Sequence, residues 1–417
     1  MSARISTNQI YGNGVKQMMS LSQQVNDTQL KISTGKRILT PADDPVASTR
    51  ILQLDQEIAL TNQYENNTIF VTSRLQQEEG VLSSIEDSIA RIRDLTISAG
   101  NGAYTKVDRK AIALEVEQRV KELFTNMNKK DASGEYMFSG FNGQSQPFVE
   151  NPGGGYQYKG DEGQRFLQIA TTTTVATSDS GKDLFLDIPS SKITFNAYGF
   201  DSNQGYPTPV ISSGLTLDQS KLDELFPDDA IIEFNNEFDV HPAKANFTVR
   251  RRSDNHIIEG MQNVPFTNNG NISFSGIQVS ITGNPAPGDD FVVQSTQKQG
   301  ILETFEKFLY GLYNLDDNPT DRSVLSNLLE DTLNNLDSAS INISEVRTQI
   351  GARLNTTEST KDLHQEMKLM AQEVRSKLAD IDFAEAVSQL QMESFVLEAA
   401  QQSYAKVTAL SLFDYIR

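Results

Sequence analysis

The chain has 417 residues, enough for two or three domains, and carries 55 acidic against 36 basic residues for a net charge of −19 at pH 7. It contains no Cys, no Trp and only three His, which excludes disulfides, thiolate chemistry and zinc sites built on cysteine. The strongly acidic balance argues against nucleic acid as the main partner.

The sequence gives no sign of a membrane partner. No apolar run approaches the roughly 20 residues that a membrane span needs. The opening stretch, MSARISTNQIYGNGVKQMMSL, lacks the apolar core of a secretory signal, so we expect no cleaved signal peptide. If the protein leaves the cell, we expect it to do so by another route.

Residues 1–40 predict a coiled-coil helix. Every third or fourth residue falls on one stripe, a spacing typical of a coiled-coil seam or a bundle face. The stripe consists of Tyr11, Gly14, Met18, Leu21, Val25, Thr28 and Ile32. Because Gly and Thr weaken this seam, we expect the helix to gain its order by packing against another helix or another subunit.

Residues 33–48, STGKRILTPADDPVAS, predict a joint between two helices. Gly35 and Pro41 end the first helix, Asp44 suits the N-cap of the second, and Pro45 suits its first position. The joint contains a basic pair, Lys36 and Arg37, and an acidic pair, Asp43 and Asp44. The predicted joint residues are Gly35, Lys36, Arg37, Pro41, Asp43, Asp44 and Pro45.

The acidic pair of the joint, Asp43 and Asp44, could also bind a metal or act in acid–base chemistry. Adjacent carboxylates at a helix start are more often caps, and no His lies nearby in the sequence. We therefore assign them no metal or catalytic role.

Residues 136–298 differ in kind from their flanks. They hold 19 of the 33 Phe and Tyr, 16 of the 26 Gly and 10 of the 13 Pro. Stretches such as SKITFNAYGF, ANFTVRRRS and GIQVSITG alternate with a period of two between turn residues, which predicts short strands. We expect one β-rich outer domain here, or two small ones.

No motif in the β-rich zone defines a catalytic or cofactor site. Gly153, Gly154 and Gly155 are not followed by the Lys-Ser or Lys-Thr pair of a phosphate-binding loop. For His241 and His256, surface or hydrogen-bonded histidines are favoured over a zinc pair. The run from Arg250 to Arg252 fits either a solvated strand or a contact to an acidic neighbour. The residues leave both questions open.

The C-terminal flank returns to helical spacing. In residues 299–383 an interval of three and four runs through Leu329, Leu333, Leu336, Ser340 and Ile343. The same interval runs through Leu82, Ile85, Ile89 and Ile92 in residues 41–135. Residues 384–417 continue this interval near the end of the chain. Their predicted contact residues are Val387, Leu390, Leu397, Tyr404, Val407 and Leu410.

The two ends carry opposite charge. Residues 1–40 hold five basic groups and one acid, and residues 378–417 hold six acids and two basic groups. The bland interpretation is chance. The alternative is that the two ends meet, within one chain or between neighbouring subunits, and that the electrostatic attraction between their opposite charges helps to pair them.

The predicted fold is α+β, a long antiparallel helical bundle or coiled coil formed by the N- and C-terminal regions with an inserted β-rich domain. Residues 1–40 are expected to pair with 384–417, and residues 41–135 with 299–383, while 136–298 form the β-rich outer domain.

Several motifs resemble the flagellin superfamily and, within it, the family of flagellar hook-associated protein 3 at the hook–filament junction. They are RISTNQI, LKISTGKRILTPADDPVAS, GEYMFSGFNGQSQPF, LADIDFAEAVSQLQ and the ending LSLFDYIR. TPADDP and SLFDYIR favour the junction family over flagellin, whose chains more usually end LSLLR. GNPAPGDDFVV resembles a turn and strand common in hook-associated proteins.

The resemblance implies a structural adaptor of the bacterial flagellum, secreted through the flagellar type III channel without a cleaved signal. Such proteins assemble as a ring of their own copies on the first junction protein and present the surface on which flagellin polymerises. Their terminal helices form an inner coiled-coil tube. A flagellar export chaperone holds the C-terminal helix before export, so the contact residues of 384–417 would serve the chaperone first and other subunits later.

Two alternatives remain. The chain could be a flagellin filament subunit, or a secreted adhesin or hydrolase with its activity in the β-rich domain. The residues show no catalytic set, so we predict that it is not an enzyme and assign no catalytic, cofactor-binding or metal-binding residue.

Overall fold

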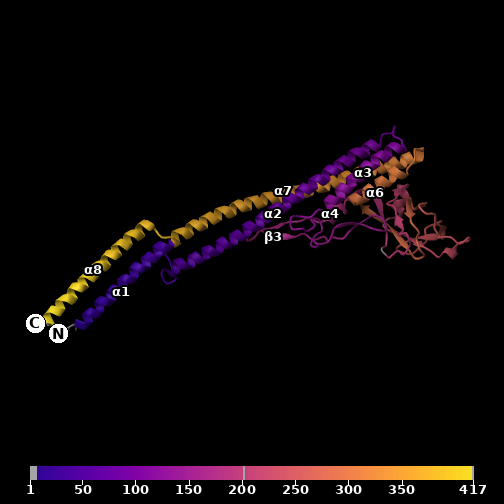
Figure 1. The fold of residues 1–417 in the computed structure, drawn as a ribbon. Helices are drawn as coiled ribbons and strands as arrows, with labels where there is room; N and C mark the ends of the chain where they lie inside the picture. The colour runs from indigo at the N-terminus through magenta and orange to yellow at the C-terminus, as the bar shows by residue number, and fades with distance from the viewer. Residues whose placement is uncertain (1–6, 201, 416–417) are drawn as a thin grey trace. The chain divides into compact units, whose positions relative to one another are not determined.

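A computed structural model describes residues 7–200 and 202–415. The chain divides into two compact units, which are described separately (Figure 1). The terminal unit comprises residues 1–66 and 359–417, and the central unit comprises residues 67–358. No described helix is both long and apolar enough to cross a membrane.

The terminal unit is helical. Its elements are α1 (Thr7–Thr34), the start of α2 (Pro45–Ala99), the end of α7 (Pro319–Ala379) and α8 (Phe383–Tyr415). Helices α1 and α8 lie side by side and antiparallel (Figure 1). The parts of α2 and α7 in this unit are joined by ion pairs between Asp55 and Arg375 and between Glu65 and Lys368.

The central unit has a helical core built on the expected spacing. In α2, the residues Leu75, Leu82, Ile85, Ile89 and Ile92 are fully buried, and they pack against the other helices of the unit. These are α3 (Lys106–Met127), α6 (Ile301–Asn314) and the first part of α7.

Helix α3 is held at its first turn. A capping box joins Thr105 and Asp108, in which the side chain of each accepts a backbone N–H of the other. The next residue, Arg109, is buried and donates to Asp317 at 2.7 Å and to the Leu315 carbonyl at 2.8 Å. These bonds fix the start of α3 to the connection between α6 and α7.

Residues 136–188 belong to the helical core. A turn segment, two short hairpins and one helical turn bring Phe138, Phe148 and Phe185 into the same apolar cluster as α2 and α3. The elements are β1 (Phe148–Glu150), β2 (Tyr156–Tyr158), β3 (Phe166–Gln168), β4 (Thr174–Ala176) and α4 (Gly181–Phe185).

Residues 189–298 form a β domain with its own core around Phe195, Phe234 and Phe291. Its antiparallel five-stranded sheet has the order β10-β9-β8-β13-β5, so β5 is an edge strand. The bounds are β5 (Pro189–Gly199), β8 (Ala230–Phe234), β9 (Asn246–Arg251), β10 (Val264–Pro265) and β13 (Asp290–Lys298).

A second sheet and two short helical elements complete the β domain. Their bounds are β6 (Val210–Ile211), β7 (Leu215–Thr216), α5 (Gln219–Leu225), η1 (Glu237–Asp239), β11 (Asn271–Phe274) and β12 (Ile277–Thr282). The first and last residues of the domain lie together, because Gln299 N–H donates to the Ile188 carbonyl at 2.9 Å. The predicted fold class, a helical bundle with an inserted β-rich domain, is confirmed.

Candidate assembly interface

The predicted N-terminal seam forms one face of α1. Tyr11, Met18, Leu21, Val25 and Ile32 are all half-buried. The ring of Tyr11 meets the ring of Tyr404 edge-on, with 6.2 Å between centroids. The interval of three and four therefore places these residues along one stripe of α1, and contacts from Tyr11 and Thr28 join this stripe to α8.

A polar contact lies inside this seam. Thr28 is buried, and its hydroxyl donates to Glu393 at 2.8 Å. Shifting one helix by a turn would leave a buried hydroxyl and a carboxylate without each other. Polar pairs of this kind fix the register of helix pairs at some expense of stability.

Close approach of the helices depends on Gly14. A Cβ added at Gly14 would lie 2.9 Å from Cδ2 and 3.0 Å from Cε2 of Tyr404, whereas one added at Gly12 meets nothing within 4 Å. The two glycines therefore form a matched pair, one beneath an aromatic ring and one in open space.

We expect Gly14→Ala and Gly12→Ala to act in opposite directions. The Gly12 variant should stabilise α1 by up to about 1 kcal/mol through helix propensity, and the Gly14 variant should destabilise the pair by about 1–2 kcal/mol through overpacking. Hydrogen exchange of the α1 amides in the full chain measures both effects. Equal protection in the two variants would contradict the contact with Tyr404.

The predicted joint begins where α1 ends. Gly35 has a left-handed backbone, φ +69°, as helix ends commonly require. Asp43 accepts the N–H groups of Thr40 and Leu39 at 2.9 Å, and these bonds lower the pKa of its carboxyl. Asp44 accepts the N–H of Ala47 at 2.9 Å and so caps α2, whose first residue is Pro45.

The connection between α7 and α8 lies against this joint. Arg37 N–H donates to the Ala379 carbonyl at 2.7 Å, and its guanidinium donates to the Leu378 carbonyl at 3.0 and 3.2 Å. Ile381 N–H returns a bond to the Gly35 carbonyl at 3.0 Å. The helical conformation is therefore interrupted at the same level between α1 and α2 and between α7 and α8, and backbone hydrogen bonds join the two connections.

The other predicted joint residues lie at its surface. Lys36 is exposed and forms an isolated antiparallel bridge with Asp380, while Pro41 is exposed. Arg37 and Asp44 approach to 3.9 Å with both side chains partly exposed, which adds little stability.

The C-terminal contact residues fall on two faces of α8. Leu390, Leu397 and Tyr404 are half-buried, whereas Val387 and Val407 are 43% and 49% exposed. Leu410 lies in α8, but its side chain is outside the described part of the structure. All six were predicted as contacts to a chaperone and to other subunits, and that role stays a prediction.

The sequence analysis missed small and polar members of the α8 face. Ala386 is buried, and Glu393 and Ala400 are half-buried at intervals of three and four from Leu390 and Leu397. The spacing alone would have found them if alanine and glutamate had been allowed on the seam.

Large apolar side chains remain exposed on the terminal unit. In α8, Met392 and Phe395 are 67% and 69% exposed, and Leu369 and Met370 of α7 are exposed to the same degree. Met19 of α1 and Leu52 of α2 are also largely exposed. Exposed apolar residues on several helices of one unit mark surfaces suited to further protein contacts.

The sequence left open the roles of three Arg and two His residues in the β domain. The guanidinium groups of Arg250, Arg251 and Arg252 lie within 3.1 to 3.4 Å of the carboxylates of Glu233, Asp228 and Asp229, and these three acids come from β8 or from the turn before it. His241 and His256 are exposed. Within residues 7–200 and 202–415, no group of three or more His, Cys, Asp or Glu is arranged to hold a metal ion.

Comparison with protein families identifies two regions. Residues 5–143 match the bacterial flagellin N-terminal helical region. Residues 216–295 match the D2-like domain of flagellar hook-associated protein 1. The first match covers α1 to α3, and the second covers much of the β domain.

Three relatives extend this result. Flagellar hook-associated protein 3 of Salmonella typhimurium is 29% identical over 190 residues, which is 46% of this chain and 59% of that protein. The chain thus matches about three fifths of the length of this relative. A flagellar filament 41 kDa core protein of Borreliella burgdorferi is 31% identical over 24% of this chain and 30% of its own length.

The third relative is a solved structure. The crystal structure of flagellar hook-associated protein 3 from Legionella pneumophila is 27% identical, covers 79% of this chain and 98% of that chain, and has a TM-score of 0.53. Together these matches make the chain similar to the flagellin superfamily. Within that superfamily the chain is similar to flagellar hook-associated protein 3, FlgL.

Proposed function

We propose that this chain is a structural adaptor at the hook–filament junction of the bacterial flagellum. The observation that carries the proposal is the terminal unit, in which paired terminal helices leave large apolar residues of four helices exposed. Similarity to hook-associated protein 3 over 79% of the chain supports the same assignment.

Copies of the chain assemble through these exposed faces. Residues 1–40 and 384–417 form the inner helical layer of a ring, and residues 41–135 and 299–383 form the next layer. Met392 and Phe395 point away from the seam with α1 and so remain available to a neighbouring subunit. Head-to-tail contacts between identical subunits continue from copy to copy, as an axial structure requires.

The adaptor has two further structural partners. The first junction protein binds on the hook side, and flagellin polymerises on the filament side. Before export through the flagellar type III channel, a chaperone covers α8, whose exposed Val387, Val407 and Phe395 would otherwise be open to water.

The alternative of a flagellin filament subunit is disfavoured by the β domain. Its residues 216–295 match a domain of a hook-associated protein, and the flagellar filament relative matches only 24% of the chain. A strain without the gene separates the two functions. A junction adaptor predicts hooks without filaments and monomeric flagellin in the medium, whereas a filament subunit predicts an intact junction and no main filament protein.

Removing residues 384–417 tests the adaptor directly. In a strain lacking the native gene, the shortened protein should leave hooks without filaments, counted by electron microscopy. The double variant Met392→Ser and Phe395→Ser should do the same while keeping helical circular dichroism, because it changes only exposed side chains. Normal filament growth with either variant would overturn the proposal.

Excising the β domain tests the adhesin or hydrolase alternative. Because Gln299 N–H bonds to the Ile188 carbonyl, residues 189–298 can be replaced by a short glycine linker. Lys307→Leu in the same variant avoids leaving its buried ammonium without partners. The adaptor function predicts that filaments still form, whereas an activity of the β domain would be lost with the axis unaffected.

A further inference from the structure

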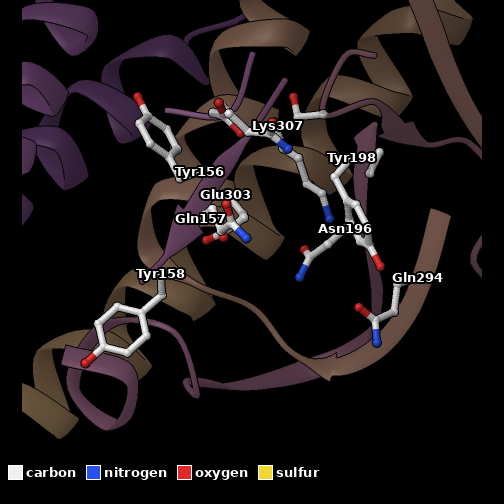
Figure 2. A pocket seen from close by; sticks show the side chains of 13 residues that line it. Tyr156, Gln157, Tyr158, Asn196, Tyr198, Gln294, Glu303 and Lys307 are labelled. Atoms are coloured by element: carbon white, nitrogen blue, oxygen red, sulfur yellow. The ribbon is translucent and has the colours of Figure 1, made fainter. Parts of the chain in front are cut away.

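A polar cavity lies where the β domain meets the helical core of the central unit. Its volume is about 380 Å³, and its walls come from β2, β5, β13 and α6. Figure 2 shows the side chains of Glu303, Gln157 and Asn196 around one space. No function described above uses this cavity.

Two carboxyl groups face the cavity without a partner. Glu303 and Glu306 lie one turn apart on α6, and both are half-buried. Apart from the N–H of Glu303 itself, neither carboxyl has a hydrogen bond or ion pair among the described residues. Burial raises the pKa of both groups, that of Glu306 to about 8, with Glu150 and the neighbouring carboxyl adding to the shift at Glu306.

The cation of the cavity wall is already engaged elsewhere. Lys307 Nζ donates to Thr194 Oγ1 at 2.6 Å and to the Phe195 carbonyl. It also lies 4.3 Å from the centroid of the Phe195 ring. The ammonium group is therefore held against β5 without an ion pair to Glu303 or Glu306, although its charge opposes the rise in the pKa of both carboxyl groups.

A third acceptor is unsatisfied. Asn196 Oδ1 is shielded from water and has no hydrogen-bond donor. Buried polar atoms in folded proteins nearly always have a partner. Apart from the N–H of Glu303 itself, these three acceptor groups around one cavity have no donor among the described residues, and they come from both the β domain and the helical core.

A donor-only group fits this set. An ammonium group offers three N–H donors and no acceptor, and its positive charge would favour the ionised form of the two carboxyl groups, whose pKa burial raises. A metal ion fits less well, because no third acid or histidine joins Glu303 and Glu306 among the residues that the structure describes. The side chain of Tyr156 adds an aromatic wall, a common feature of sites for organic cations.

We propose that this cavity binds the ammonium group of a primary amine between Glu303, Glu306 and Asn196. The amine would connect α6 to β5 and so stabilise the attachment of the β domain. Two sources share this chemistry, namely a free alkylamine and a lysine side chain of a neighbouring protein.

Isothermal titration of the full chain tests the proposal with n-butylammonium and N-acetyl-lysine amide, with n-butanol as the neutral control. Both ammonium probes should bind saturably and n-butanol should not. The double variant Glu303→Gln and Glu306→Gln should weaken binding at least about tenfold, because it removes the anionic acceptors. Glu259→Gln, at an exposed position of the β domain, is the matched control and should leave binding unchanged.

The titration results distinguish the two sources of the amine and can overturn the proposal. Equal affinity for the two probes identifies a free amine, and at least about tenfold tighter binding of the lysine derivative identifies a protein side chain. Absence of saturable binding below about 10 mM, or affinity unchanged in the double variant, overturns the proposal. Circular dichroism of the double variant establishes that lost binding does not reflect lost folding.

Discussion

Arg353→Leu is expected to lower the free energy of unfolding of the central unit by about 3–5 kcal/mol. The guanidinium of Arg353 donates to both carboxylate oxygens of Asp179, at 2.7 and 3.1 Å. Asp179 is only 5% exposed, so removing its cation leaves a buried carboxylate without its charged partner. Breaking one side of a buried pair costs far more than the intact pair contributes.

The effect of Arg353→Leu should reach beyond one ion pair. Asp179 also accepts Gln164 Nε2 at 2.6 Å, and its N–H donates to Glu78 on α2 at 3.2 Å. Arg353 lies on α7, so these contacts join two helices through the segment between β4 and α4. Losing the cation removes the charged partner of Asp179 and also the charge that opposes the raised pKa of Glu78.

Urea unfolding followed by circular dichroism measures this loss. The matched control is Arg91→Leu, because Arg91 pairs with Glu115 at 2.6 Å while both side chains stay about half exposed. An exposed pair of this kind contributes no more than about 1 kcal/mol. Adding Asp179→Asn to Arg353→Leu should restore part of the stability. Equal losses in the Arg353 and Arg91 variants would contradict the buried role of Arg353.

The fold class could be read from periodicity. Apolar residues at intervals of three and four identified the helices, since a helix must place its apolar residues along one stripe to bury them. Ile85, Ile89 and Ile92 are accordingly buried in the helical core. The β-rich zone was predicted from its many Phe and Tyr residues, which favour strands, and from its many Gly and Pro residues, which favour turns.

Periodicity did not reveal that residues 136–298 are divided between the helical core and a separate β domain. Phe148 on the three-residue β1 and Phe195 on the 11-residue β5 both come from strands. Yet Phe148 packs in the helical core, whereas Phe195 packs in the core of the β domain. Period-two alternation shows which face of a strand is buried, but it does not show what covers that face. That choice depends on contacts between residues far apart in the chain.

The candidate interface was partly readable. The α1 stripe and the helix start at Asp44 and Pro45 follow from local rules of spacing and capping. The bonds from Arg37 to the carbonyls of Leu378 and Ala379 join positions more than 340 residues apart, so no local pattern could reveal them. The assembly role of these residues stays a prediction.

Glu78→Gln should change how stability depends on pH. Glu78 is 1% exposed, and burial raises the pKa of its carboxyl to about 8, with Asp179 adding to the shift and Arg353 and Arg74 opposing it. Between pH 4.5 and about 8 the folded protein keeps a proton that the unfolded chain has lost. The free energy of unfolding should therefore fall as pH rises through this window, by about 1.4 kcal/mol per pH unit from this group.

Glutamine is neutral at every pH, and it can still accept the N–H of Asp179, so the variant removes this slope without removing the hydrogen bond. Its advantage over the native chain should grow with pH and reach on the order of 3–5 kcal/mol near pH 8. Glu306, whose pKa is also raised to about 8, leaves a residual slope of the same sign. Urea unfolding at pH 5, 6, 7 and 8 measures the difference, with the exposed Glu259→Gln as the control that should track the native chain. A Glu78→Gln curve parallel to that of the native chain would mean that the carboxyl is ionised in the folded protein across this range, and the assigned burial cost would be wrong.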